Sequence, residues 1–253
     1  MIKGKKIAVI LPAYNAEKTL SQTYLEIPKE IVDIVILTDD KSNDKTLLVA
    51  RELNIQYIIE HDMNLGYGAN QKTCYNKAIE VGADIIVMLH PDYQYTPKLI
   101  HSMCYLIIND LYQVVLGSRI LGKGALKGKM PLYRYLSNRI LTFIQNLLMN
   151  KKLSEYHSGY RAYSKRVLEE IDYNSNSNDF IFDNQILSQI IYRGYEVGEI
   201  SCPTSYFKEA SSINFGRSIV YGSGCILNAV KYFLSKTGLF HFRLFREKAS
   251  QNL

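Results

Sequence analysis

Short apolar runs alternate with helical segments over the first hundred residues, and this alternation constrains the fold more than any other feature. The run Ile85–Leu89 is β-branched and uniformly apolar, which suits a strand buried on both faces of a parallel sheet. Three earlier runs, each followed by a predicted helix, have the same character: Lys6–Leu11, Asp33–Leu37 and Ile55–Ile59. The pattern predicts an α/β fold with a Rossmann-like, doubly wound and mostly parallel sheet.

In the second half of the chain, the sequence pattern predicts further strands and helices of the same domain, followed by a tail. Strands are expected at Gln113–Leu116 and, at an edge of the sheet, at Tyr195–Ile200, and a mobile glycine-rich loop at Leu121–Met130. Helices are expected from Pro97 through Ile107, over Tyr133–Met149, from beyond Arg161 to about Ile171, and over Phe182–Tyr192. We expect residues 1–212 to form the domain and residues 213–253 an amphipathic, basic helical tail.

Composition narrows the class of protein. The chain has 253 residues, of which 47% are hydrophobic, enough for a sizeable core, and a net charge of +6. That charge suits an anionic substrate or membrane surface but is too small to indicate nucleic acid. Four isolated cysteines argue against a zinc site and a disulfide framework, so a cytoplasmic location is expected. Neither a signal peptide nor a membrane-spanning run is expected.

The central strand ends in a polar turn, His90-Pro91-Asp92-Tyr93-Gln94. Open α/β sheets bind ligands at the carboxyl ends of their strands. Asp92 and Gln94 offer oxygen atoms to a hard cation, Mg²⁺ or Mn²⁺, whose other ligands would be substrate phosphates and water. Three roles for His90 stay open: metal ligand, hydrogen-bond donor to phosphate, or packed turn residue.

Two further polar segments follow the second and third strands. Asp39 and Asp40 can accept hydrogen bonds from ribose hydroxyls or a base, although short polar residues there can simply cap the next helix. Asn64, Gly66 and Gly68 form a loop whose backbone N–H groups can approach a phosphate, or which makes only a tight turn. The segment is neither a dinucleotide-binding fingerprint nor a P-loop.

Several arginines suggest a second anion site apart from the metal. Arg119 and Arg161 each follow a glycine-containing turn or strand end, and Arg134 lies on a predicted helix. Guanidinium groups bind phosphate through paired hydrogen bonds, so the acceptor is expected to be anionic. If the second ligand is instead a neutral hydroxyl compound, Asp183 is the candidate base. The competing interpretation of Asp183 is a carboxylate that stabilises a helix N-terminus.

Six short motifs occur in a fixed order along the chain: Pro12-Ala-Tyr-Asn15, Asp39-Asp40-x-Ser-x-Asp44, Asn64-x-Gly-x-Gly-Ala69, Asp92-x-Gln94, Gly117-Ser-Arg119 and Ser158-Gly-Tyr-Arg-Ala-Tyr163. In this order they resemble the motifs of GT-A family 2 glycosyltransferases, in the branch that acts on polyprenyl phosphates. The resemblance implies a GT-A fold and an inverting, Mg²⁺- or Mn²⁺-dependent transfer. The sugar would pass from a UDP- or GDP-linked nucleotide sugar to a dolichyl- or undecaprenyl-type phosphate, in cell-envelope glycan biosynthesis.

The resemblance also assigns residues. It implies Asp92 and Gln94 at the metal, Asp39 at the nucleotide, and Arg119 and Arg134 at the lipid phosphate; we add Arg161 and Asp183 as catalytic candidates. The predicted donor site comprises Pro12, Tyr14, Asn15, Asp39, Asp40, Asn64, Gly66, Gly68 and His90.

Two departures from the family pattern leave questions open. His90 replaces the first acid of the usual Asp-x-Asp, so the metal's identity is not fixed, and His157 stands where it can contact either substrate. The apolar tail and its arginines predict either peripheral binding to the cytoplasmic face of a membrane or packing in a homo-oligomer. Alternative functions are transfer to a glycan hydroxyl and non-catalytic nucleotide-sugar binding; a nucleotidyltransferase is a weaker fourth.

Overall fold

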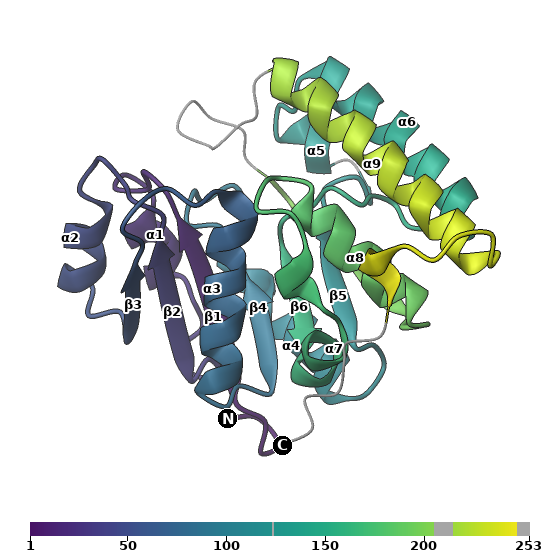
Figure 1. Ribbon diagram of the computed structural model, residues 1–253. Helices are drawn as coiled ribbons and strands as arrows, with labels where there is room; N and C mark the ends of the chain where they lie inside the picture. Colours follow the sequence, from purple (N-terminus) through teal and green to yellow (C-terminus); the bar gives the residue numbers. More distant parts are fainter. Residues whose placement is uncertain (123, 205–214, 247–253) are drawn as a thin grey trace.

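A seven-stranded mixed sheet organises the computed structural model, which describes residues 1–122, 124–204 and 215–246 (Figure 1). The strands lie in the order β3-β2-β1-β4-β6-β5-β7. Their bounds are β1 Ile7–Ala13, β2 Ile34–Asp39, β3 Tyr57–Glu60, β4 Ile85–Met88, β5 Val114–Ser118, β6 Arg161–Ser164 and β7 Val197–Ser201. The predicted α/β class and mostly parallel sheet are confirmed.

The order of the strands changes direction at β1: β2 and β3 lie on one side of it and β4 lies on the other. β1 pairs in parallel with β2 on one side and with β4 on the other. Such a switch point separates the connections on the two sides and opens a crevice at the carboxyl ends of the strands. Asp39 ends β2 and His90 follows β4, two strand spacings away, or roughly 10 Å.

β6 is antiparallel to both of its neighbours, β4 and β5. The sequence pattern does not predict this strand; it predicts a helix soon after Arg161. In the structure Arg161 begins the strand, opposite Met88 of β4 and Leu116 of β5, and only then does α7 begin. Four residues beginning with an arginine do not carry the apolar signature of a buried strand.

Helices cover both faces of the sheet. Their bounds are α1 Leu20–Leu25, α2 Thr46–Glu52, α3 Tyr67–Glu80, α4 Ile100–Ile108, α5 Gly124–Lys127, α6 Leu132–Met149, α7 Lys165–Glu170, α8 Phe182–Tyr192 and α9 Phe215–Lys236, with short 3₁₀ turns at Pro97–Leu99, Tyr173–Ser175 and Arg243–Phe245. Side chains alternate along β1, so that Ala8 and Ile10 pack toward α3, α7 and α8, while Val9 and Leu11 pack toward α1, α2 and α4. Two apolar cores result.

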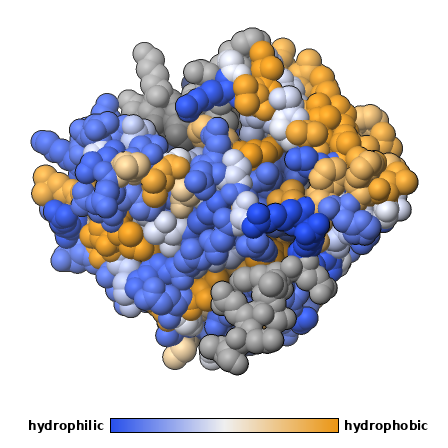
Figure 2. Space-filling view, in the orientation of Figure 1, coloured by the Kyte–Doolittle hydropathy of each residue, from blue (hydrophilic) through white to orange (hydrophobic). Residues whose placement is uncertain are grey.

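α6 and α9 lie side by side beyond the carboxyl ends of the parallel strands (Figure 1). At Gly222 of α9 a Cβ would lie 3.5 Å from Leu141 of α6, which is ordinary van der Waals contact. Both helices leave large apolar side chains exposed, with Phe143 69% and Leu147 72% exposed on α6. Figure 2 shows apolar side chains gathered over these helices on the visible face.

Several smaller predictions concern the loop before α6, the edge strand, the cysteines and the domain division. The region expected to be a mobile loop contains the short helix α5, although residue 123 lies outside the described residues. β7 lies at an edge of the sheet as predicted, and the four cysteines are buried and unbonded. Among the described residues, no helix combines the length and the apolar character needed to span a bilayer. The domain division at residue 212 stays a prediction.

Candidate functional site

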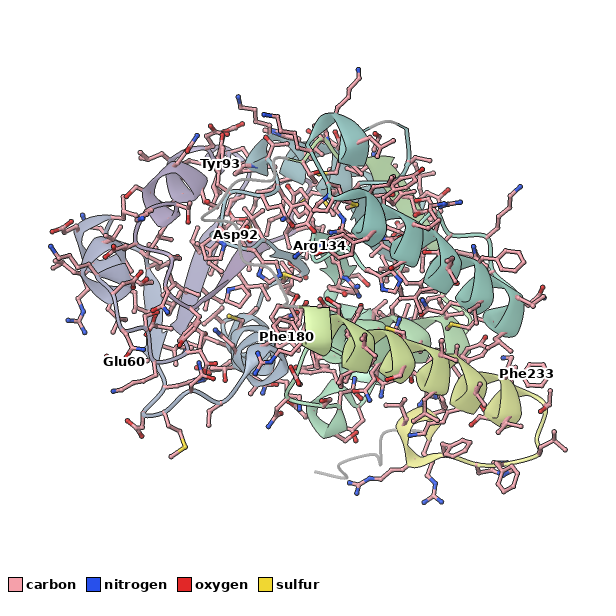
Figure 3. The ribbon with its side chains drawn as sticks, turned by 90° about the horizontal axis from the view of Figure 1, so that it is seen from above. Glu60, Asp92, Tyr93, Arg134, Phe180 and Phe233 are labelled. Carbon is pink, nitrogen blue, oxygen red and sulfur yellow. The ribbon has the colours of Figure 1, made fainter. Side chains whose placement is uncertain are left out.

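A cavity of about 460 Å³ lies between the carboxyl ends of the strands and the α6–α9 pair. It brings together six of the residues singled out from the sequence: His90, Asp92, Gln94, Arg119, Arg134 and Asp183. Figure 3 shows Asp92, from the loop after β4, and Arg134, from α6, both lying in the region between the sheet and the helix pair. The remaining wall comes from Tyr67, Tyr95, Met130, Tyr133, Ser137, Asn138, Ile140, Leu141, His157, Gly159, Phe180, Ser218, Ile219, Tyr221 and Gly222.

Asp92 and Gln94 form the oxygen-rich part of the cavity wall. One Asp92 oxygen accepts the backbone N–H of Gln94 at 3.0 Å, so the loop closes on itself and directs both side chains from one turn. In the described chain no three His, Cys, Asp or Glu side chains gather as a metal cage. This donor set fits Mg²⁺ or Mn²⁺ only if substrate oxygens supply most of the coordination sphere, as these ions accept.

His90 is held by a hydrogen-bonded chain that reaches Asp183. The Tyr67 hydroxyl lies 2.9 Å from His90 Nε2 and donates to Asp183 Oδ2 at 2.6 Å. Gln71 donates to the other Asp183 oxygen at 3.2 Å. Burial and the adjacent Asp183 charge raise the pKa of Tyr67 well above its ordinary value, so the phenol keeps its proton. Gly159 packs so closely against the ring that a Cβ there would lie 2.6 Å from His90 Nε2, which is a clash.

Arg119 reaches the cavity from the end of β5, while Arg134 comes from the first turn of α6. Arg119 donates to the buried carboxylate of Glu155, with 2.7 Å between Nη2 and Oε2. Arg134 lies beside Tyr133, whose hydroxyl accepts from Arg134 Nε at 3.0 Å. Two guanidinium groups from separate elements therefore border one cavity, an arrangement suited to an anion.

Arg161 differs from the sequence-based expectation. The side chain is 0% exposed and does not line the cavity. Its guanidinium donates to three backbone carbonyls, those of Ser158 at 2.7 Å, Asp183 at 2.6 Å and Tyr156 at 3.0 Å. Arg161 thus ties the loop before β6 to the first turn of α8, and it holds Asp183 in place instead of contacting a substrate phosphate.

The predicted donor residues at the ends of β1 and β2 form a separate polar cluster. Asp39 is buried and accepts from both the backbone N–H and the hydroxyl of Ser42. Asn15 adopts φ 53°, donates its N–H to Ser42 Oγ, and accepts from Asn43. Tyr14 is exposed beside it and Pro12 lies buried within β1. These loops brace one another at the end of the sheet where Asp92 also lies.

The loop Asn64–Gly68 is already bound by protein groups. The Asp40 carboxylate accepts the backbone N–H groups of Leu65 at 2.8 Å and Gly66 at 2.9 Å, and its Oδ1 also contacts His61. The N–H of Gly68 donates to the Asn178 carbonyl at 2.7 Å. A Cβ at Gly66 or Gly68 would clash with the backbone of residues 177–178. The glycines therefore admit a neighbouring chain segment, in place of the phosphate that the sequence suggested.

Most of the other residues of the cavity wall were not identified from the sequence as functional, and they include Tyr67, Asn138 and Tyr221. His157 was noted, and its ring Nδ1 lies 2.9 Å from the Tyr221 hydroxyl on α9. Burial lowers the pKa of His157 to about 4, against an opposing effect of Glu155, so the ring is neutral at pH 7. A tyrosine on a helix face gives no sequence signal for such a contact.

Comparison with known proteins agrees with this geometry. Residues 8–172 match the model of the family described as "Glycosyl transferase family 2". The chain is 31% identical over 218 residues to a UDP-N-acetylglucosamine–dolichyl-phosphate N-acetylglucosaminyltransferase of Methanococcus voltae, covering 80% of this chain and 86% of that protein. It is 27% identical over 203 residues to a dolichyl-phosphate hexose transferase of Haloferax volcanii, covering 78% and 82%.

A solved structure extends the likeness to the whole fold. Glucosyl-3-phosphoglycerate synthase of Mycobacterium tuberculosis, in complex with Mn²⁺, UDP and glucosyl-3-phosphoglycerate, superposes with a TM-score of 0.65 at 16% identity. The match covers 93% of this chain and 81% of that one, and it identifies the GT-A fold. The family match, the relatives and the fold agree, and the chain belongs to glycosyl transferase family 2 as a glycosyltransferase.

Proposed function

We propose that this glycosyltransferase moves a sugar, with inversion, from a UDP-linked donor to a polyprenyl phosphate of the dolichyl or undecaprenyl type. One observation carries the proposal. A single cavity has the Asp92–Gln94 turn in one wall, Arg119 and Arg134 in others, and the apolar α6–α9 pair at its side. The relatives named for dolichyl phosphate support the acceptor, and the relative named for a UDP-sugar supports the donor.

The proposed reaction forms one bond and breaks one. An oxygen of the lipid phosphate attacks the anomeric carbon while the bond from that carbon to the nucleotide diphosphate breaks, and the diphosphate leaves with the electron pair. A phosphate is already an anion at pH 7, so this nucleophile needs no strong base. That suits a site in which Asp183 is engaged by Tyr67 and Gln71.

The chain's own residues would do the positioning. Arg119 and Arg134 would orient the acceptor phosphate, which converts an encounter of two substrates into a prearranged geometry. Asp92 and Gln94 would hold the donor diphosphate through Mg²⁺ or Mn²⁺, an ion that supplies charge neutralisation to the leaving group when bound. Asp39, buried at the end of β2, would border the nucleotide side.

The apolar pair α6–α9 would bring the enzyme to its lipid. Its exposed side chains include Leu132, Leu136, Ile140, Phe143 and Leu147 on α6, and Ile219, Val220, Leu227 and Phe233 on α9. Exposed apolar side chains at helical spacing beside a basic segment are typical of peripheral binding to anionic lipid. The enzyme would therefore act at the cytoplasmic face of a membrane. A homo-oligomer through the same helices is the alternative.

A transfer assay tests the proposal. Radiolabelled UDP- and GDP-sugars are incubated with undecaprenyl or dolichyl phosphate in detergent with Mn²⁺ or Mg²⁺, and label in the organic phase is counted. We expect a lipid-linked product with a UDP-sugar. Asp92→Asn should abolish it, while Asp110→Asn, at an exposed position with φ 55° that asparagine tolerates, should not. Transfer to a glycan hydroxyl, with no lipid product from any donor, would overturn the proposal.

A further inference from the structure

Arg119 is held along one edge by a buried acid, Glu155, from the loop between α6 and β6. The backbone N–H of Arg119 donates to Glu155 Oε1 at 2.5 Å, and Nη2 donates to Oε2 at 2.7 Å. Nε lies 3.2 Å from the same Oε2, and Nη2 also donates to the His157 carbonyl at 2.9 Å. Glu155 thereby fixes both the backbone and the side chain of the arginine.

α6 contributes to the same carboxylate. Asn138 Nδ2 donates to Glu155 Oε2 at 3.0 Å, while Asn138 Oδ1 accepts from the Thr142 hydroxyl at 3.2 Å. An ionised carboxylate can only accept, so the orientation of the Asn138 amide is determined. The network therefore joins three elements around the cavity: the end of β5, the second turn of α6, and the loop before β6.

The Arg119–Glu155 pair is largely buried, and this strengthens the restraint on both side chains. Glu155 is 0% exposed and Arg119 is 12% exposed. Burial alone would raise the pKa of Glu155, but the Arg119 charge and the hydrogen bonds from Arg119 and Asn138 outweigh it, so the pKa lies below its ordinary value. A buried carboxylate costs free energy unless it is paired. Movement of the Arg119 guanidinium away from Glu155 would leave that charge unpaired, so the guanidinium is restrained beside it.

We infer that Glu155 is a positioning residue for the acceptor, because it fixes the Arg119 guanidinium at the cavity wall before the lipid phosphate arrives. This inference rests on the proposed function. An arginine side chain otherwise loses considerable conformational freedom when it binds an anion, and holding it beforehand removes that cost from binding. Glu155 acts through Arg119, so its effect should fall on the acceptor and spare the donor.

Direct binding separates positioning from a purely structural role. We would measure the dissociation constant of radiolabelled farnesyl phosphate by equilibrium dialysis, together with the KM values of lipid acceptor and nucleotide sugar. Glu155→Gln should raise the dissociation constant and the acceptor KM by about tenfold, the effect of losing about 1.4 kcal/mol. The donor KM should stay within about twofold, that is, within about 0.4 kcal/mol.

Two variants serve as controls. Glu155→Asp keeps the charge on a shorter side chain and should recover part of the loss, and it carries the test if Glu155→Gln does not fold. Glu199→Gln removes a neighbouring, half-buried carboxylate that accepts from the Ser154 N–H at 2.9 Å and lies outside the cavity wall. It should leave farnesyl phosphate binding unchanged.

The dependence on Arg119 is tested by a double variant. In an Arg119→Ala background, Glu155→Gln should have no further effect on farnesyl phosphate binding, because the group it positions is gone. An equal loss in both backgrounds, or a matching rise in the donor KM, would overturn the inference alone. Failure of the wild-type protein to bind farnesyl phosphate would overturn the proposed acceptor, and this inference with it.

Discussion

The hydroxyl group of Tyr67 donates a hydrogen bond to Asp183 across 2.6 Å, although the two residues are 116 positions apart. A phenol has one proton, so the same oxygen can only accept from His90 Nε2, at 2.9 Å. His90 therefore carries a proton on Nε2. The orientation of this histidine depends on α3 and α8 as well as on its own loop.

Tyr67→Phe should lower transfer activity by about tenfold, since a hydrogen-bond network worth about 1.4 kcal/mol is lost while the ring remains. Both the donor to Asp183 and the acceptor for His90 disappear in this variant. Initial-rate kinetics would measure the effect. Tyr105→Phe, at an exposed position of α4, is the matched control and should be unaffected. Full activity of Tyr67→Phe would contradict a role for this chain of hydrogen bonds.

Arg161→Lys should destabilise the protein by about 2–4 kcal/mol, because a single ammonium group cannot reach all three carbonyls and leaves buried acceptors unsatisfied. Urea-induced unfolding followed by circular dichroism would give the free energy of unfolding. Arg166→Lys, which alters an exposed ion pair with Glu170, should change it little. Equal effects of the two substitutions would be inconsistent with the role described for Arg161.

His157 should make the protein less stable as the pH falls from 7.5 to 5. The unfolded histidine takes up a proton near its ordinary pKa of about 6.5, whereas the folded one does so only near 4. Between these values the unfolded state binds more protons, so folding free energy is lost as pH falls, by about 2 kcal/mol at pH 5. Denaturant unfolding at both pH values measures this loss.

In that experiment His157→Gln should remove most of the pH dependence between 7.5 and 5. His241→Gln, which changes an exposed histidine, should retain it. A wild-type stability that does not vary over this range would mean that His157 titrates normally in the folded protein.

Phe143→Asp should weaken co-sedimentation with anionic vesicles severalfold, because it places a charge on the exposed apolar face of α6. Leu111→Asp makes the same kind of change at a 63% exposed leucine after α4, away from α6 and α9, and should leave vesicle binding as it was. If neither variant differs from the wild type, but Phe143→Asp changes the sedimentation velocity of the free protein, the apolar face is a subunit contact instead.

The sequence predicted structure correctly where a regular pattern of residue types reflects a regular pattern of burial. Uniformly apolar runs such as Ile85–Leu89 predicted the buried strands, and the polar turns after them predicted Asp92 and Gln94 at the cavity. β6 was not predicted because it is four residues long and begins with a charged side chain. That side chain is buried only because three backbone carbonyls accept its hydrogen bonds, one of them the carbonyl of Asp183 on α8. No local pattern records such a partner.

Polar residues posed the same problem in the site. Asp40 and Arg161 have the residue types expected for ligand binding, yet both are occupied by protein groups. Tyr67 lay inside a motif that was recognised for its glycines, and its hydroxyl was overlooked. Which partner a polar group finds is decided by the tertiary fold, and residue type alone does not determine it.

The family match ends at residue 172, but α9, which starts at Phe215, supplies Ser218, Ile219, Tyr221 and Gly222 to the cavity wall. β2, which ends at Asp39, and β4, which is followed by His90, are thus encoded in a different stretch of the chain from the helix that closes the opposite side. Under the proposed function, exchanging that one helix between relatives would alter acceptor preference without touching the predicted donor-site residues, and chimaeric enzymes could be joined before α9.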